Sequence, residues 1–138
     1  MLLKYRMRSE NELRLRMRRK KFDERLISET IEFLKEKEFI DDSSFAKAWV
    51  SSRKNQGFGL RRITQELRLK GVPEEIIKSR ISESKDDYPE KQIVSELASR
   101  KLSKSKGIDP KAAKRRVYAY LLRRGFSPDV VIEVLNSR

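Results

Sequence analysis

Residues 63–77 read ITQELRLKGVPEEII, and two other stretches align with them without a gap: residues 13–27 (LRLRMRRKKFDERLI) and residues 117–131 (VYAYLLRRGFSPDVV). In each stretch, apolar residues stand at offsets 0, 4, 9, 13 and 14 from the first position. Offsets 0 and 4 share one face of an α-helix, and offsets 13 and 14 fold a second helix back onto it. One helical hairpin therefore occurs three times, which predicts a tandem-repeat protein.

The hinge of this hairpin lies at offset 8, where the second and third copies carry Gly71 and Gly125. Glycine adopts the left-handed conformation that ends many helices without steric strain. Pro73 and Pro128 follow at positions suited to the first turn of a new helix. Lys21 stands in place of glycine in the first copy, and we expect it to destabilise or shift the turn.

A further helix is predicted ahead of the second and third hairpins. In the second copy, Phe45, Trp49 and Val50 form its apolar face, and Asp42 is its expected cap. Its counterpart in the third copy begins at Pro89. The repeat unit is therefore expected to contain three helices.

Only residues 1–8 precede the first hairpin, so the first repeat is expected to be shortened at its N-terminus. That hairpin opens with Ser9-Glu10-Asn11-Glu12, which is typical of a capping box. The fold class predicted is all-α, an elongated array of three tandem three-helix repeats: 1–40 (shortened), 41–86 and 87–138. The helices, about eight in number, are expected at 9–21, 23–37, 43–55, 60–70, 73–84, 89–104, 110–124 and 128–137.

Two segments rich in glycine, serine and charge separate predicted helices, at residues 55–59 and 103–107. Such segments commonly form turns and loops, and both are expected to be mobile joints. The acid pairs Asp41-Asp42 and Asp86-Asp87 each precede a predicted helix. Carboxylates are favoured at helix N-termini, so capping is a better interpretation of these pairs than metal binding.

The composition excludes most catalytic chemistry. Hydrophobic residues make up 37% of the 138 residues and charged residues 40%, and the chain contains no cysteine and no histidine. The commonest general base, the commonest metal ligand and any thiolate nucleophile are therefore missing. We expect a protein without catalytic residues, metal or cofactor. It lacks a long apolar run and a signal peptide, so we expect it to be soluble, cytoplasmic and unattached to membranes.

The net charge of +13 predicts a polyanionic partner, and the excess of basic residues is banded. Residues 1–25, 51–70 and 100–138 carry net charges of +6, +5 and +8, whereas residues 26–50 and 71–99 each carry −3. Arginine outnumbers lysine in the basic bands. Its planar guanidinium group can form two parallel hydrogen bonds to one carboxylate or phosphate. The predicted partner surface consists of Arg14, Arg18, Arg19, Arg53, Arg61, Arg62, Arg68, Lys70, Lys114, Arg115, Arg116, Arg123 and Arg124.

Several blocks of the chain resemble the bacterial RecX family. They are Tyr5-Arg6-x-Arg8-Ser9-x-x-Glu12-Leu13-Arg14, Phe39-Ile40-Asp41-Asp42-x-x-Phe45-Ala46-x-Ala48-Trp49-Val50-x-Ser52-Arg53, Gly59-x-Arg61-Arg62-Ile63-x-Gln65-Glu66-Leu67-x-x-Lys70-Gly71-Val72 and Leu121-x-Arg123-Arg124-Gly125-Phe126. The resemblance runs from about residue 5 to the C-terminus. The two central blocks are the most specific, since they combine a tryptophan, an acid pair, a double arginine and a lysine-glycine at set distances.

The resemblance implies a regulatory protein in recombination, DNA repair and the SOS response. Such a protein binds the RecA–DNA filament and mostly inhibits its ATPase and strand-exchange activities. Direct contact with single- or double-stranded DNA is expected to be weak and non-specific, and the chain is expected to be a monomer. The alternative is a free-standing basic helical DNA-binding module. Its weakness is that the helices after both hinge glycines open with acidic residues, Pro73-Glu74-Glu75 and Ser127-Pro128-Asp129, where base-reading side chains would be needed.

Overall fold

The computed structural model describes residues 9–37 and 40–138, and within these ranges it contains eight α-helices and no β-strand. The all-α prediction is therefore confirmed. The predicted shortening of the first repeat concerns residues 1–8, which lie outside the described residues, as do residues 38 and 39 of the turn after the first hairpin. The helices are α2 (Glu10–Arg19), α3 (Glu24–Glu36), α4 (Asp42–Asn55), α5 (Leu60–Leu69), α6 (Glu74–Ser84), α7 (Glu90–Ser103), α8 (Pro110–Arg123) and α9 (Pro128–Asn136).

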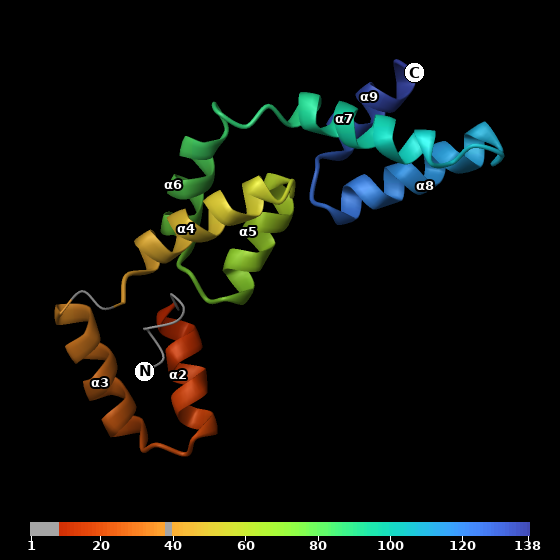
Figure 1. Cartoon of the computed structure of the whole chain (residues 1–138). Helices are drawn as coiled ribbons and strands as arrows, with labels where there is room; N and C mark the ends of the chain where they lie inside the picture. The colour runs from red at the N-terminus through yellow and green to blue at the C-terminus, as the bar shows by residue number, and fades with distance from the viewer. Residues whose placement is uncertain (1–8, 38–39) are drawn as a thin grey trace.

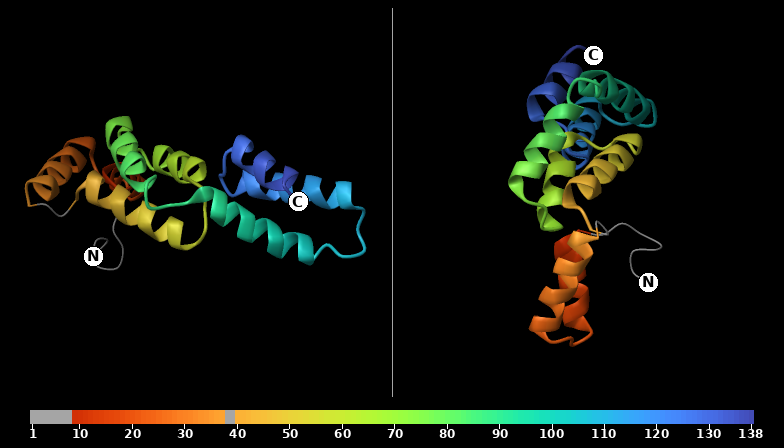
Figure 2. Two further views of the ribbon diagram at one scale, coloured as in Figure 1. Left: turned by 90° about the horizontal axis from the view of Figure 1, so that it is seen from above. Right: turned by 90° about the vertical axis from the view of Figure 1, so that its left-hand side faces the viewer.

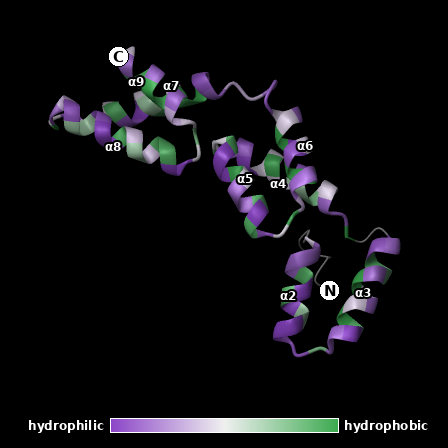
Figure 3. Cartoon of the chain, turned by 180° about the vertical axis from the view of Figure 1, so that it is seen from behind, coloured by the Kyte–Doolittle hydropathy of each residue, from purple (hydrophilic) through white to green (hydrophobic). Residues whose placement is uncertain are grey.

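The helices form three sets that follow one another along an elongated array (Figure 1, Figure 2). We name them the first repeat (α2 and α3), the second repeat (α4, α5 and α6) and the third repeat (α7, α8 and α9). Figure 3 shows hydrophilic residues on every helix, with hydrophobic residues interspersed. The layers are thin, as the high fraction of charged residues predicts. The repeat boundaries suggested by the sequence stay predictions.

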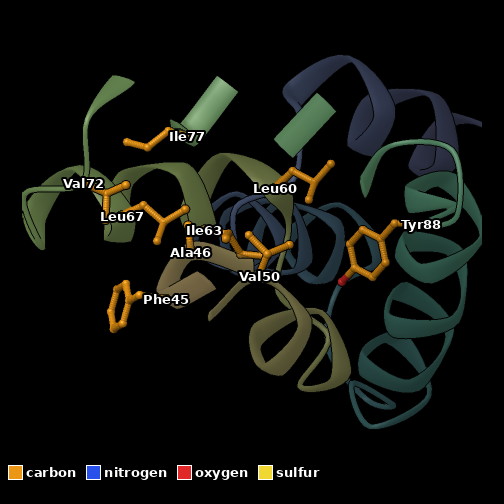
Figure 4. Close-up of a cluster of buried hydrophobic side chains, with 9 residues drawn as sticks. All are labelled: Phe45, Ala46, Val50, Leu60, Ile63, Leu67, Val72, Ile77 and Tyr88. Atoms are coloured by element: carbon orange, nitrogen blue, oxygen red, sulfur yellow. The ribbon is translucent and has the colours of Figure 1, made fainter. Parts of the chain in front are cut away.

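Each repeat has its own cluster of buried apolar side chains, and the hairpin offsets supply about half of them. In the second repeat the cluster includes Ile63, Leu67, Val72 and Ile77, packed on α4 and on Tyr88 (Figure 4). The equivalent positions of the third repeat, Val117, Leu121, Phe126 and Val131, are also buried. In the first repeat the cluster is Leu13, Ile27, Ile31 and Ile40. Burying one such side chain stabilises the fold by about 1.5–3 kcal/mol.

The first repeat differs from the other two at offset 9. Val72 and Phe126 are buried beneath α4 and α7, whereas Phe22 is 45% exposed. The described part of the first repeat contains only the hairpin helices. The burial of this position therefore depends on the helix that precedes the hairpin.

Local capping follows the sequence with one correction. Ser9 and Glu12 form the predicted capping box at the start of α2. The cap of α4, however, is Asp41 and not Asp42: the Asp41 carboxylate accepts the backbone N–H groups of Ser43 and Ser44. Asp42 accepts a hydrogen bond from the first repeat instead, as described below.

The three hinge residues share a left-handed backbone. The φ angles are +79° at Gly71, +100° at Gly125 and +63° at Lys21. Lys21 therefore forms the same turn as Gly71 and Gly125. Because Lys21 has a Cβ atom, this left-handed backbone is strained by about 1–2 kcal/mol. A side chain is tolerated there because Lys21 is exposed, whereas a Cβ atom at Gly71 or Gly125 would lie 2.5 Å or less from a neighbouring repeat.

Replacing Lys21 by glycine should relieve this strain. We expect Lys21→Gly to raise the free energy of unfolding by about 1 kcal/mol in urea titrations. Lys20→Gly is the matched control, because Lys20 has a φ of −84° and glycine there adds only flexibility. Equal effects of the two substitutions would contradict the assignment of strain to Lys21.

Candidate polyanion-binding surface

The second and third repeats are joined through backbone groups at two helix ends. The N–H of Gly59 donates to the carbonyl of Arg124 at 2.8 Å, and the N–H of Arg61 donates to the carbonyl of Gly125 at 3.1 Å. A Cβ atom on Gly59 would lie 2.2 Å from the Gly125 carbonyl oxygen. Residues 55–59 therefore form a packed joint and not the mobile connection expected from their glycine content.

Three arginines surround one aromatic ring at this joint. The guanidinium carbons of Arg53, Arg62 and Arg124 lie 3.9, 4.3 and 4.2 Å from the centre of the Phe58 ring. Each such cation–π contact stabilises by roughly 0.5–2 kcal/mol, depending on desolvation. Arg124 also donates to the carbonyls of Gln56 and Gly57. The ring and the arginine side chains thus hold the connecting loop against the third repeat.

Glu66 is the carboxylate that balances this group of arginines. It accepts hydrogen bonds from both Nε and Nη2 of Arg53, at 2.9 and 2.6 Å, and from the Trp49 indole at 3.0 Å. Arg62 adds a contact at 3.3 Å. Burial alone would raise the pKa of Glu66, but the hydrogen bonds from Arg53, Trp49 and Arg62 outweigh it and lower the pKa. Trp49 therefore belongs to the interior network and is not free to stack on a base.

The joint between the first and second repeats follows the same geometry. The Ser9 hydroxyl donates to the carbonyl of Lys70 at 2.8 Å. A Cβ atom on Gly71 would meet Asn11 at 2.5 Å. The Lys70 ammonium lies 3.5 Å from Glu12 and 4.4 Å from the centre of the Trp49 ring. At both joints, then, the start of one hairpin helix meets the end of the equivalent helix in the next repeat.

Each joint also contains a carboxyl group supplied by the next repeat. Asp42 accepts the N–H of Glu10 at 3.0 Å, and the carboxylate of Glu90 interacts with the N–H of Leu60. Burial raises the pKa of both carboxyls. Their contribution to stability is consequently greatest at low pH and is lost as pH rises through the folded-state pKa.

Six of the thirteen residues predicted for the partner surface are engaged within the array. Arg53, Arg62, Lys70 and Arg124 lie in the joints described above. The other two, Arg18 and Arg68, form equivalent ion pairs with Glu24 and Glu74 across the hairpin turns of the first and second repeats. The structure therefore does not gather all thirteen cations on one face.

The remaining predicted cations are more available. Arg14 lies 4.0 Å from Glu10, and Lys114 donates to the carbonyl of Arg138 at 3.0 Å. Five of the predicted arginines are exposed and have no ion pair or side-chain hydrogen bond with a described residue: Arg19, Arg61, Arg115, Arg116 and Arg123.

Further cations outside the predicted partner surface extend it on the third repeat. Residues 100–124 contain ten basic side chains and a single acidic one, Asp109. Asp109 caps α8 by accepting the N–H of Ala112. Lys101 lies 4.3 Å from the centre of the Tyr120 ring. The exposed additions are Arg100, Lys101, Lys104, Lys106 and Lys111. The high density of basic residues in this segment is the sequence feature from which these cations could be predicted.

Other kinds of site find no support in residues 9–37 and 40–138. No group of three or more histidine, cysteine, aspartate or glutamate side chains is arranged to hold a metal ion there. Within the same ranges, none of the helices combines the length and apolar character needed to cross a membrane. In the acid pairs, Asp41 caps α4 and Asp87 forms an ion pair with Lys54 at 2.9 Å.

These features define a class of protein: a tandem array of helical repeats, joined rigidly at helix ends, with a basic surface. Models of three domains of the RecX family match the chain: the first three-helix domain over residues 1–34, the second over residues 41–79 and the third over residues 90–135. The regulatory protein RecX of Amycolatopsis mediterranei is 33% identical over 137 residues, which cover 99% of this chain and 78% of that protein. The chain belongs to the RecX family.

Other relatives agree with this assignment. The regulatory protein RecX of Bacillus licheniformis is 36% identical over 137 residues, covering 98% of this chain and 51% of that protein. The chain therefore spans about half the length of that relative. A crystal structure of RecX from Lactobacillus salivarius is similar with a TM-score of 0.82 and 23% identity, covering 99% of this chain and 88% of that one. A second crystal structure, of regulatory protein RecX, has a TM-score of 0.84 and 22% identity, covering 98% and 66%.

The Glu66 network provides a test of the joint. We expect Glu66→Gln to lower the free energy of unfolding by about 2 kcal/mol at pH 7, because partly buried guanidinium groups lose their carboxylate. Since the pKa of Glu66 is lowered in the folded state, its contribution is present above the ordinary value of 4.5 and lost as pH falls through the folded-state pKa. The difference between wild type and variant, measured in urea, should therefore shrink below about pH 4.

Glu29→Gln is the control for this measurement. Glu29 pairs with Arg25 on the surface, with both side chains more than 60% exposed, and such pairs contribute about 0–1 kcal/mol. A loss at Glu66 no larger than the loss at Glu29, or a loss independent of pH, would contradict the account of the joint.

Proposed function

We propose that this chain binds the RecA–DNA filament and modulates, mostly inhibiting, its ATPase and strand-exchange activities. Membership of the RecX family supports a regulatory role. The observation that carries the proposal is that each of the three repeats presents an exposed arginine without an ion pair to a described residue, namely Arg19, Arg61 and Arg115. A filament is a repeating polyanion, so an array with cations at intervals suits it better than a single basic patch.

The cations also suggest how the two components of the filament are contacted. Arg19, Arg61 and Arg115 come from the first, second and third repeats and are exposed. A guanidinium group can form two parallel hydrogen bonds to a carboxylate or to a phosphate. Contact with DNA is accordingly weak, non-specific and sensitive to salt, because it depends on phosphates alone.

The proposal is one of binding and not of catalysis. No histidine or cysteine is present, and the acidic groups of the joints are engaged in caps and ion pairs. We expect the chain to act in the cytoplasm as a monomer without a cofactor, in recombination, DNA repair and the SOS response.

A free-standing DNA-binding module is the weaker alternative. In that case α6 would be the helix that enters the major groove, since it follows the hairpin turn. Its first turn contains Glu74 and Glu75, and Glu74 forms an ion pair with Arg68. Carboxylates at this position repel phosphates and leave few donors for base edges. Sequence-specific binding to naked duplex DNA would favour this alternative.

A titration of the chain against RecA filaments on single-stranded DNA tests the proposal through the rate of ATP hydrolysis. We expect a dose-dependent fall in rate. The paired substitutions Arg115→Glu and Arg116→Glu should raise the concentration for half-inhibition by about tenfold, which corresponds to about 1.4 kcal/mol of binding energy. Half-inhibition far below one chain per RecA would indicate capping of filament ends, and near-stoichiometric half-inhibition would indicate coating.

The control replaces Lys47 and Lys78 by glutamate. Both lysines are exposed, lie in the acidic bands of the sequence and form no ion pair with a described residue. An unchanged ATPase rate at stoichiometric excess of wild-type chain would sink the proposal. Equal losses in the two double variants would show that overall charge, and not the exposed arginines, determines binding.

A further inference from the structure

The third repeat has an apolar groove between its two hairpin helices. The groove encloses about 450 Å³ and is lined by Lys114, Arg115, Tyr118, Ile132, Leu135 and Asn136. Ile132 is 44% exposed, an unusual position for a side chain that gains from burial. The lining contains two basic side chains and no acidic one. The groove therefore combines an apolar floor with a positively charged edge.

The corresponding groove of the second repeat encloses about 380 Å³, and the chain segment that follows α6 forms part of its wall. It is lined by Leu60, Arg61, Thr64 and Ile81, the counterparts of Lys114, Arg115, Tyr118 and Leu135. Lys85, Tyr88 and Glu90, from the segment that leads to the third repeat, complete its lining. Tyr88 is buried there and donates its hydroxyl to the carbonyl of Phe58, while Glu90 faces the N–H of Leu60. Burial raises the pKa of Tyr88 to about 12, so its hydroxyl stays protonated.

An equivalent segment follows the hairpin of the first repeat. Ile40 packs in the cluster with Leu13, Ile27 and Ile31, and two residues later Asp42 accepts the N–H of Glu10. Both segments thus show the same short pattern, a bulky apolar residue followed two positions later by an acidic one. The two instances are Ile40-x-Asp42 and Tyr88-x-Glu90.

The groove of the third repeat also carries apolar residues at two positions that are polar or charged in the other repeats. Tyr118 corresponds to Arg14 and Thr64 of the other repeats. Ile132 corresponds to Ser28 and Lys78. An exposed apolar groove of this kind is typical of a binding site for another chain.

The cationic edge replaces the backbone donors of the other grooves. Helix α8 begins at Pro110, four residues before Lys114, so the amide of Lys114 lies inside the helix and is unavailable. The side chains of Lys114 and Arg115 stand at the positions of Leu60 and Arg61. They can pair with a carboxylate, the group that the N–H of Leu60 contacts in the second repeat.

We propose that the α8–α9 groove binds a segment of a partner protein that carries a bulky apolar residue followed two positions later by an acidic residue. The inference rests on the proposed function, in which this partner is the protein component of the filament. The apolar side chain lies against Tyr118, Ile132 and Leu135, and the carboxylate meets Lys114 or Arg115. An apolar floor suits a protein side chain better than a phosphate backbone, which would leave Ile132 uncovered.

A peptide titration tests the groove without any RecA. The probe is a synthetic peptide with the sequence of residues 83–94, which contains Tyr88-x-Glu90, added to the ¹⁵N-labelled full chain. The amides of Tyr118 and Ile132 should shift, and a peptide with Tyr88→Ala and Glu90→Gln should leave them unchanged. Absence of shifts in the groove, or equal shifts with both peptides, would overturn the inference.

A binding assay on RecA filaments tests the identity of the partner. Tyr118→Thr together with Ile132→Lys installs the residues of the second repeat, so the helices should be preserved. Binding should weaken about tenfold even though a positive charge is added, which rules out a general electrostatic effect. The control is Leu69→Lys, because Leu69 is 83% exposed and lies outside the groove.

The outcomes separate the two proposals. If the wild type binds filaments and the groove variant binds equally well, the assignment of the groove to this partner is wrong. If the wild type fails to bind filaments, the proposed function falls, while the peptide titration still decides whether the groove accepts its pattern. Self-association of the wild type that disappears in the groove variant would identify a second copy as the occupant and overturn the inference.

Discussion

The array depends on one kind of contact, in which the start of a hairpin helix meets the end of the equivalent helix in the next repeat. Helix ends leave backbone N–H and C=O groups without partners inside the helix. Here the two ends supply each other: Gly59 donates to the Arg124 carbonyl, and the Ser9 hydroxyl donates to the Lys70 carbonyl. The chain segments approach so closely that a Cβ atom at Gly59 or Gly125 would meet backbone atoms of the neighbouring repeat, and one at Gly71 would meet the Asn11 side chain. The repeat spacing follows from this constraint.

The same contact explains why the basic residues divide into two groups. Carbonyls at the end of a helix attract cations, and Arg62 and Arg124 lie beside them, stacked on Phe58. Their neighbours in the same double-arginine motifs, Arg61 and Arg123, are exposed and unpaired within the described residues. Each motif therefore contributes one cation to the joint and one to the surface. Inside the joint, Glu66 pairs with Arg53 and Arg62, whereas Arg124 donates to backbone carbonyls.

Local patterns in the sequence predict the fold well, but they do not predict the contacts between repeats. The helices and many of the buried residues follow from the spacing of apolar residues within a single hairpin. The glycines at 57 and 59 suggested mobility, yet Phe58 and Arg124, 66 residues apart, hold that loop in place. The sequence predicts Asp42 as the cap of its own helix. The N–H that it accepts in the structure comes from Glu10 of another repeat, and no local pattern reveals this contact. Of the predicted cations, those facing solvent and those in joints have the same local sequence context, so no local signal distinguishes them.

The central claim is that the joints fix the second and third repeats relative to each other. Because the chain contains no cysteine, spin labels can be placed at single introduced cysteines, Glu75→Cys on α6 and Lys111→Cys on α8, both at exposed positions. Pulsed electron–electron double resonance then measures the distance between them. A single narrow distance distribution, broadened by Phe58→Ala, is the result that the account predicts. A broad distribution in the otherwise wild-type chain would contradict it.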